Sequence, residues 1–180
     1  LEPPSTRIDP HNPEARGAAM VEVNVAMIAV DAEGSPVLLL RPVDEAEAGV
    51  MLPIWIGPME TAAIMVASGM TDAPERPLTY DLMVRLLDAL GGSVRRVEVT
   101  ALVEGTFHAT LTLLTPEGER PIDARPSDSI ALALRVGAPI FVADEVMAEA
   151  AIPDVTHDAG QTLAEFTDFI EQVEPDDFRN

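Results

Sequence analysis

The order of strand-like and helix-like patterns along the chain limits the fold more than any other feature of the sequence. Alternating apolar and polar residues bounded by turn residues predict strands, whereas apolar residues spaced by three and four predict helices. Because the two patterns interleave irregularly, we expect an α+β fold, a single domain whose helices pack on a mixed or antiparallel sheet. Strands are predicted over 21–30, 37–40, 51–57, 94–103, 106–115, 121–124 and 139–142, and helices over 58–70, 79–90, 128–136 and 144–151.

Two of these segments carry local signals of their own. Pro53 lies inside the strand predicted over 51–57, and proline lacks a backbone donor, so we expect this strand at an edge or a bulge. In the helix predicted over 79–90, Leu82, Leu86 and Leu90 fall on one face together with Met83 and Leu87. That helix is predicted to be amphipathic.

The two ends of the chain differ from the middle. Residues 1–19 hold Pro3, Pro4, Pro10 and Pro13 among polar and charged neighbours, and we interpret them as a flexible arm. Residues 152–180 form an acidic extension with a predicted helix near 162–173, which either packs on the domain or binds a partner subunit. The folded domain is therefore predicted over 20–151, a size that allows one sizeable core.

Charge is distributed unevenly along this acidic chain. The formal net charge is −20, and all 11 basic residues are arginine. Residues 1–75 carry 3 Arg against 12 acids, residues 141–180 carry 1 against 11, and residues 76–140 carry 7 against 8. Non-specific nucleic-acid binding needs many cationic side chains, so the composition argues against a protein that coats DNA. Only the middle segment would not broadly repel an anionic ligand.

Several classes of function are excluded by what the sequence lacks. Without cysteine there is no disulfide framework, no thiolate zinc site and no thiol nucleophile. There is no apolar run of about 18 residues, so no membrane partner is expected and the cytoplasm is the predicted location. The sequence also has no glycine-rich phosphate loop, no His-Glu-x-x-His and no Gly-x-Ser-x-Gly.

Two short clusters could carry chemistry, Arg76 to Asp81 and Asp123 to Asp128. Each has an Arg-Pro pair, then a hydroxyl residue at a predicted helix start (Thr79 or Ser127), then a carboxylate in the first turn. Arginine and the exposed N–H groups of a helix start both favour anions. Two such helix starts facing one cleft would form an anion-binding groove.

Carboxylates in and near these clusters could serve catalysis. Mg²⁺ or Mn²⁺ takes oxygen ligands during phosphodiester hydrolysis, and we expect such an ion, if present, at Asp123 and Asp128. The alternative is structural: Thr79 and Ser127 are ordinary caps, and Arg125 pairs with Asp123 or with Asp81. The residues that could supply carboxylates are Glu60, Asp81, Asp123 and Asp128.

The chain resembles the bifunctional nuclease family over roughly 20–151. The resemblance is carried by segments 52–60, 76–82, 105–109, 123–134 and 137–142, which occur in the family's order and approximate spacing. It implies an α+β fold, cleavage of RNA and DNA and a tendency to form homo-oligomers. The site positions that it implies are Glu60, Arg76, Thr79, Asp81, Asp123, Arg125, Ser127 and Asp128.

Two residues depart from the family pattern. Tyr80 stands where the family usually has histidine, and His108 stands where it usually has an aromatic residue. The unperturbed pKa of tyrosine is about 10, so Tyr80 cannot directly replace a histidine base. The exchanged identities suggest that Tyr80 and His108 are neighbours and that His108 supplies the acid or base.

Two functions follow as hypotheses. The first is a nuclease assisted by a divalent metal, in which the carboxylates hold the ion and Arg76 and Arg125 stabilise phosphate charge. The second is a non-catalytic regulatory module that binds a small anion or a protein partner in the same groove. Both hypotheses require the two helix starts to meet at one solvent-accessible site.

Overall fold

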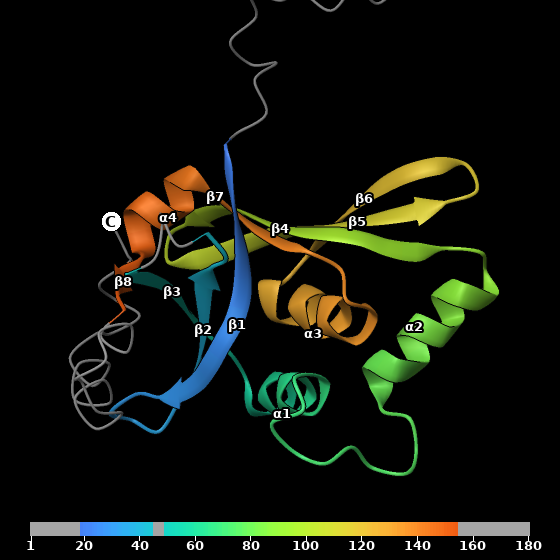
Figure 1. Ribbon diagram of the computed structural model, residues 1–180, viewed down its shortest axis with the longest axis horizontal. Helices are drawn as coiled ribbons and strands as arrows, with labels where there is room; N and C mark the ends of the chain where they lie inside the picture. The colour runs from blue at the N-terminus through green and yellow to red at the C-terminus, as the bar shows by residue number, and fades with distance from the viewer. Residues whose placement is uncertain (1–18, 45–48, 155–180) are drawn as a thin grey trace, which may run out of the picture.

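A computed structural model describes residues 19–44 and 49–154 of the chain (Figure 1). The predicted arm and the predicted helix near 162–173 therefore lie outside the described residues, apart from Ala19. The elements are β1 (Met20–Val30), β2 (Pro36–Pro42), β3 (Val50–Trp55), α1 (Pro58–Ala67), α2 (Thr79–Ala89), β4 (Ser93–Val103), β5 (Thr106–Thr115), β6 (Gly118–Ala124), α3 (Pro126–Val136), β7 (Ile140–Ala143), α4 (Asp144–Ala150) and β8 (Ile152–Pro153).

The described strands form one mixed sheet of eight strands in the order β6-β5-β4-β7-β1-β2-β3-β8. Within β1 to β3 and within β4 to β6, consecutive strands pair as antiparallel hairpins, and β5 pairs with both β4 and β6. The parallel pairing of β4 with β7 joins the two antiparallel halves, because β7 also pairs with β1. The predicted α+β class is confirmed.

The prediction for Pro53 is also confirmed. Pro53 pairs with Leu39 of β2 on one side of β3. On the other side, β8 pairs with Val50 and Met51, and no other described strand reaches Pro53, so in this part of the chain β3 is an edge strand there. A missing backbone donor costs least at such an open edge.

The core lies mainly on the side of the sheet that the helices cover. Figure 1 shows α1, α2 and α3 gathered on one side of the long strands β4 and β5, while α4 lies beside β7 and β8. Leu38 and Leu40 of β2 point into this core, whereas Val37 and Leu39 enter a smaller cluster on the opposite face. All four are fully buried, as expected for their continuous apolar run.

Helix α2 departs from the usual amphipathic arrangement. Its apolar stripe points to solvent: the exposed fractions are 54% for Leu82, 54% for Leu86, 79% for Leu90 and 40% for Met83. The helix is attached to the body through Tyr80 and Val84 instead, which pack against the core. In this part of the chain, apolar periodicity identified the helix but not the face that packs.

Within the described residues, no helix is both long enough and apolar enough to span a bilayer.

Candidate functional site

The openings of α1, α2 and α3 meet at one cluster of charged and polar side chains. Arg125, the residue before α3, donates from Nη2 to Glu60 Oε1 of α1 at 2.8 Å. It also donates from Nε to Asp128 Oδ2 at 2.7 Å and from Nη2 to Asp128 Oδ1 at 3.1 Å. From α2, the Tyr80 hydroxyl donates to Asp128 Oδ1 at 2.5 Å. Both predicted helix starts thus contribute to one site, together with a third.

The local sequence explains why α3 begins where it does. Arg125 is the N-cap in an extended conformation, and Pro126 occupies the first helical position, where its fixed φ and missing N–H are tolerated. The predicted cap at Ser127 is wrong, because Ser127 already lies inside the first turn and makes no capping bond. Ser127 is buried, and in the described part of the chain its hydroxyl has no hydrogen-bond partner.

The cap of α2 also differs from the prediction. The N-cap is Leu78, and Asp81 closes the first turn by accepting the Leu78 N–H at Oδ2, 2.7 Å away. The predicted cap at Thr79 is therefore wrong, and the Thr79 side chain is exposed to solvent. A carboxylate three residues into a helix can take over a capping role that sequence inspection assigns to a hydroxyl.

Arg135 belongs to the site although sequence inspection did not select it. Its Nε donates to Asp81 Oδ1 at 2.6 Å, and its Nη1 donates to Ala131 O at 2.7 Å. Its guanidinium lies 5.2 Å from the centroid of the Tyr80 ring. The signal available in the sequence is the seven-residue spacing from Asp128, which places both residues on one face of α3. Arg135 and Asp128 together position Tyr80.

The side-chain environment fixes the protonation states of the cluster. Burial raises the pKa of the Tyr80 hydroxyl, and its hydrogen bond to Asp128 raises it further, so Tyr80 is a neutral donor at physiological pH. Burial also raises the pKa of Asp128, but hydrogen bonds from Arg125 and Tyr80 outweigh this and the net pKa is lowered. Asp128 and Glu60 accept hydrogen bonds from Arg125 and raise the pKa of its guanidinium. Asp128 is therefore a stable anion and a weak base.

These contacts predict a loss of stability in acid. The Leu78 N–H and Arg135 lower the pKa of Asp81, and the pKa of Asp128 is lowered as well. A depressed folded-state pKa contributes stability above the unfolded value of about 3.9, and this contribution is lost as the pH falls through the folded value. We expect the melting temperature to fall as the pH is lowered below about 4. Thermal melts of the Asp81→Asn, Asp128→Asn double variant should show a smaller drop, and equal drops would contradict this account.

Besides the exposed Thr79, three predicted site residues are not part of the cluster. Arg76 is exposed and forms no ion pair among the described residues. Phe107 and Leu111 pack against the core, and side chains alternate along β5, so His108 points to the opposite face of the sheet. Asp123 pairs with Thr110 and shares that opposite face.

Two specific expectations are corrected by this arrangement. The sheet lies between Tyr80 and His108, so the hypothesis that they are neighbours is wrong. Arg125 pairs with Glu60 and Asp128, not with Asp123 or Asp81. The face of the sheet on which a strand residue lies depends on how the sheet packs, and a short sequence motif does not contain that information.

The carboxylates do not form a metal site as they stand. Among residues 19–44 and 49–154, no three His, Cys, Asp or Glu side chains form a group that could hold a metal ion. Both oxygens of Asp128 already accept hydrogen bonds, and Asp123 lies on the other face of the sheet. Asp123 and Asp128 lie on opposite faces of the sheet and do not fit a shared divalent cation, whereas assistance of the reaction by Mg²⁺ or Mn²⁺ stays a prediction.

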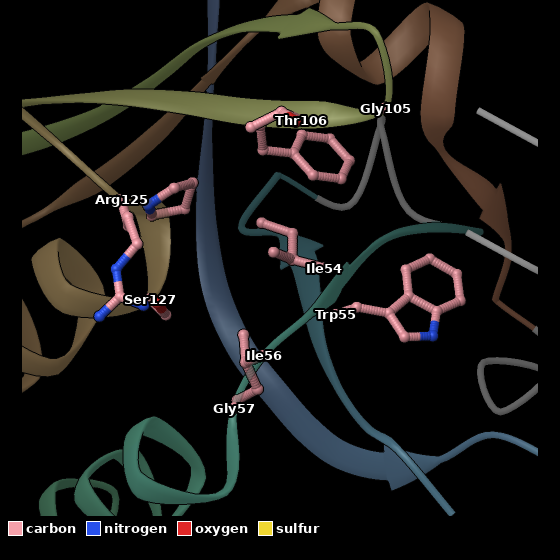
Figure 2. A pocket seen from close by; sticks show the side chains of 10 residues that line it. Ile54, Trp55, Ile56, Gly57, Gly105, Thr106, Arg125 and Ser127 are labelled. Carbon is pink, nitrogen blue, oxygen red and sulfur yellow. The ribbon is translucent and has the colours of Figure 1, made fainter. Parts of the chain in front are cut away.

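A pocket with a volume of about 240 Å³ adjoins the cluster (Figure 2). It shares Arg125 and Ser127 with the charged site, and Gly57 at the start of α1 also lines it. Figure 2 shows Ile54 and Ile56 on one side of the space and Arg125 and Ser127 on the other. The remaining lining residues are Trp55, Gly105, Thr106, Phe107 and Pro126.

The fold and the cluster define an α+β domain with an arginine–carboxylate site where three helices begin. The family model of the bifunctional nuclease domain matches residues 38–154. The chain therefore belongs to the bifunctional nuclease domain family, and the resemblance inferred from sequence is confirmed.

Relatives extend the comparison. An uncharacterised protein of Mycobacterium tuberculosis is 43% identical over 169 residues, which make up 89% of this chain and 99% of that protein. Bifunctional nuclease 2 of Arabidopsis thaliana is 33% identical over 103 residues, 54% of this chain and 30% of the plant protein. Bifunctional nuclease 1 of the same plant is 32% identical over 112 residues, 59% of this chain and 33% of the plant protein. The plant proteins share the domain but are much longer.

Proposed function

We propose that the chain is a nuclease that hydrolyses phosphodiester bonds of RNA or DNA at the Arg125 cluster. Family membership supports this proposal, and the observation that carries it is the state of Arg125. The Arg125 side chain is 66% exposed although two carboxylates hold its position. Among the described residues its Nη1 atom has no partner, so two N–H groups remain for a phosphate oxygen.

The acidic residues around Arg125 divide into two roles. Asp128 orients Arg125 and accepts from Tyr80, and its lowered pKa makes it a poor proton acceptor. Glu60 has one oxygen on Arg125 and is therefore held beside the phosphate that Arg125 would bind. We assign Glu60 as the general base.

In the proposed reaction, Glu60 takes a proton from water as the water oxygen attacks phosphorus. The bond to the leaving ribose or deoxyribose oxygen breaks, and that oxygen takes a proton from solvent. Arg125 stabilises the charge that accumulates on the non-bridging oxygens. Tyr80 takes no part in proton transfer, since it stays neutral and serves to fix Asp128.

Cleavage by a Glu60→Gln variant tests the proposal. Glutamine keeps an acceptor for Arg125 but cannot take a proton from water, and general-base catalysis is worth about 100-fold to 10,000-fold. We expect cleavage of labelled single-stranded RNA and DNA to fall by at least about 100-fold. The assay is run with Mg²⁺, with Mn²⁺ and with EDTA, which tests metal assistance separately.

The matched control is Glu98→Gln on the polar face of β4. Glu98 is also paired with an arginine, Arg96, but lies away from the cluster. Wild-type rates are expected for this control. If wild type is inert under all three conditions, the non-catalytic hypothesis replaces the nuclease, and the site becomes one that binds a small anion or a protein partner.

We also propose that the chain forms homo-oligomers through the exposed stripe of α2. Contiguous apolar surface of this kind usually marks an interaction site. A second copy fits because an identical stripe can pack against it ridge into groove about a two-fold axis. On α2, Arg85 stands against Asp81 and Asp88, and Asp81 already pairs with Arg135, so the helix carries little net charge although the chain as a whole carries −20.

Replacement of Leu86 by lysine is expected to convert the oligomer to monomer. A charge at the centre of the stripe would have to be buried without a partner. Molar mass from light scattering after size exclusion measures the change. Val30→Lys is the control, since Val30 is 51% exposed at the end of β1, a strand that pairs with β2 and β7 and not with the region around α2. A wild-type monomer at high concentration would refute the interface.

A further inference from the structure

The apolar pocket beside Arg125 is larger than the proposed chemistry requires. Phosphate hydrolysis at Arg125 uses its guanidinium, Glu60 and one water, none of which needs an apolar wall. Yet the pocket is walled by the side chains of Ile54, Ile56, Phe107 and Pro126. A volume of about 240 Å³ lies below the usual range for drug-sized ligands, so the pocket suits a single ring system.

The mouth of the pocket is suited to an anion. Ser127 is only 7% exposed, its hydroxyl has no hydrogen-bond partner in the described part of the chain, and it lines the pocket. The first intrahelical bond of α3 is donated by Ser129 to Arg125 O, so the N–H groups of Ser127 and Asp128 precede the helical ladder. Arg125 adds the two free N–H groups of Nη1. The Ser127 hydroxyl is open to the pocket, where a bound anion can accept a hydrogen bond from it.

The pocket has an apolar wall and, at its mouth, hydrogen-bond donors that can bind an anion. This combination is complementary to one nucleotide. A nucleobase has apolar faces that stack on an aromatic ring, and its sugar carries a phosphate within reach of the same site. Trp55 does not supply the ring, because its Nε1 donates to Asp31 at 2.9 Å and its side chain points away in Figure 2. Phe107 is the remaining aromatic residue of the lining.

We propose that this pocket binds one nucleobase against Phe107 while Ser127 and Arg125 bind the adjoining phosphate. The inference rests on the proposed nuclease function and narrows its substrate class to single-stranded nucleic acid. A base paired in a duplex cannot enter the pocket, whereas an unpaired base can. Stacking is tolerant of sequence, so purines and pyrimidines should both bind.

Trp55 provides a fluorescence readout, because it is the chain's single tryptophan and its neighbours along the chain, Ile54 and Ile56, line the pocket. Its fluorescence is titrated with adenosine 5′-monophosphate, uridine 5′-monophosphate, ribose 5-phosphate and inorganic phosphate. Both nucleotides are expected to bind more tightly than ribose 5-phosphate or inorganic phosphate. Loss of one stacked base weakens binding by roughly 5-fold to 150-fold, so Phe107→Leu should weaken nucleotide binding within that range and leave phosphate binding unchanged.

Two further variants separate the pocket from general damage to the fold. Phe107→Tyr keeps the ring and should keep nucleotide affinity. Ser127→Ala should weaken both nucleotides and inorganic phosphate, because it removes a donor to the anion. Thermal melts establish that each variant is folded before the titrations are compared.

The outcomes distinguish the pocket from the nuclease activity. Nucleotide binding that depends on Phe107 in a protein that cleaves nothing supports the pocket and refutes the nuclease. Equal cleavage of single-stranded and duplex substrates, with nucleotides binding no better than inorganic phosphate, refutes the pocket and keeps the nuclease. Preferred single-strand cleavage that Phe107→Leu abolishes supports both.

Discussion

Substitution of Arg125 by glutamine is expected to reduce cleavage of RNA or DNA by about 100-fold to 1,000-fold, the usual effect of removing a preorganised donor to a developing oxyanion. Arg125 holds Glu60 and Asp128 and also offers the free Nη1 donors. The variant thus loses the phosphate contact and the positioning of the base together. Single-turnover rates with labelled single-stranded substrate measure the effect.

The matched control for Arg125 is Arg120→Gln. Arg120 is similarly exposed and forms an ion pair with a carboxylate three residues away, Glu117, but it lies on β6 outside the cluster. Its variant should retain the wild-type rate. A rate for Arg125→Gln within about threefold of wild type would place the chemistry elsewhere, since a lost oxyanion contact costs far more.

Local sequence patterns predicted most elements of the fold. Alternation identified the hairpin of β4 and β5, because its strands are adjacent in sequence and share one short turn. The parallel contact between β4 and β7 could not be predicted, since it joins segments separated by two strands and a helix. Sheet order depends on such long-range pairings, which periodicity does not encode.

The sequence indicated which residues gather at the cluster better than it indicated which of them contact one another. The Arg-Pro start of α3 pointed to Arg125 and Asp128, which the structure brings together, because a proline at the first helical position is a local signal. The partnership of Arg125 with Glu60 spans 65 residues and follows only from the packing of α1 against α3. The position of the Glu60 carboxylate also depends on Gly57, because a Cβ at that residue would collide with it.

The face of an element was the least predictable property. His108 and Asp123 occur in family-like motifs, but the alternation of β5 and the pairing of β6 turn both away from the helices. The apolar stripe of α2 points to solvent for a related reason. Tyr80, Asp81 and Arg135 attach the helix through polar contacts, so a different face packs.

The contact between Asp81 and Arg135 leads to the second large prediction, which concerns stability. The Arg135 side chain is 7% exposed, whereas that of Asp81 is 34% exposed. In the described part of the chain, Nη2 of Arg135 is buried without a hydrogen-bond partner. Asp81 is thus the carboxylate that compensates a nearly buried cation, and the two residues should not be equally sensitive to substitution.

Replacement of Asp81 by asparagine is expected to lower the free energy of unfolding by about 3 kcal/mol, because an uncompensated cation stays buried. Asparagine can still accept the Leu78 N–H, so the cap of α2 is largely kept. Arg135→Met should cost less, about 1 kcal/mol, since a long apolar chain fills the same space and Asp81 remains partly solvated. Urea denaturation at neutral pH measures both.

The double variant Asp81→Asn, Arg135→Met provides the decisive comparison. Once the cation is gone, loss of the carboxylate leaves no buried charge without a partner, so the double variant should be more stable than Asp81→Asn alone. This recovery would not occur if Asp81 acted only as a helix cap, because a cap is lost equally with or without Arg135. Equal costs for the two single variants would likewise show that Arg135 is adequately solvated without Asp81.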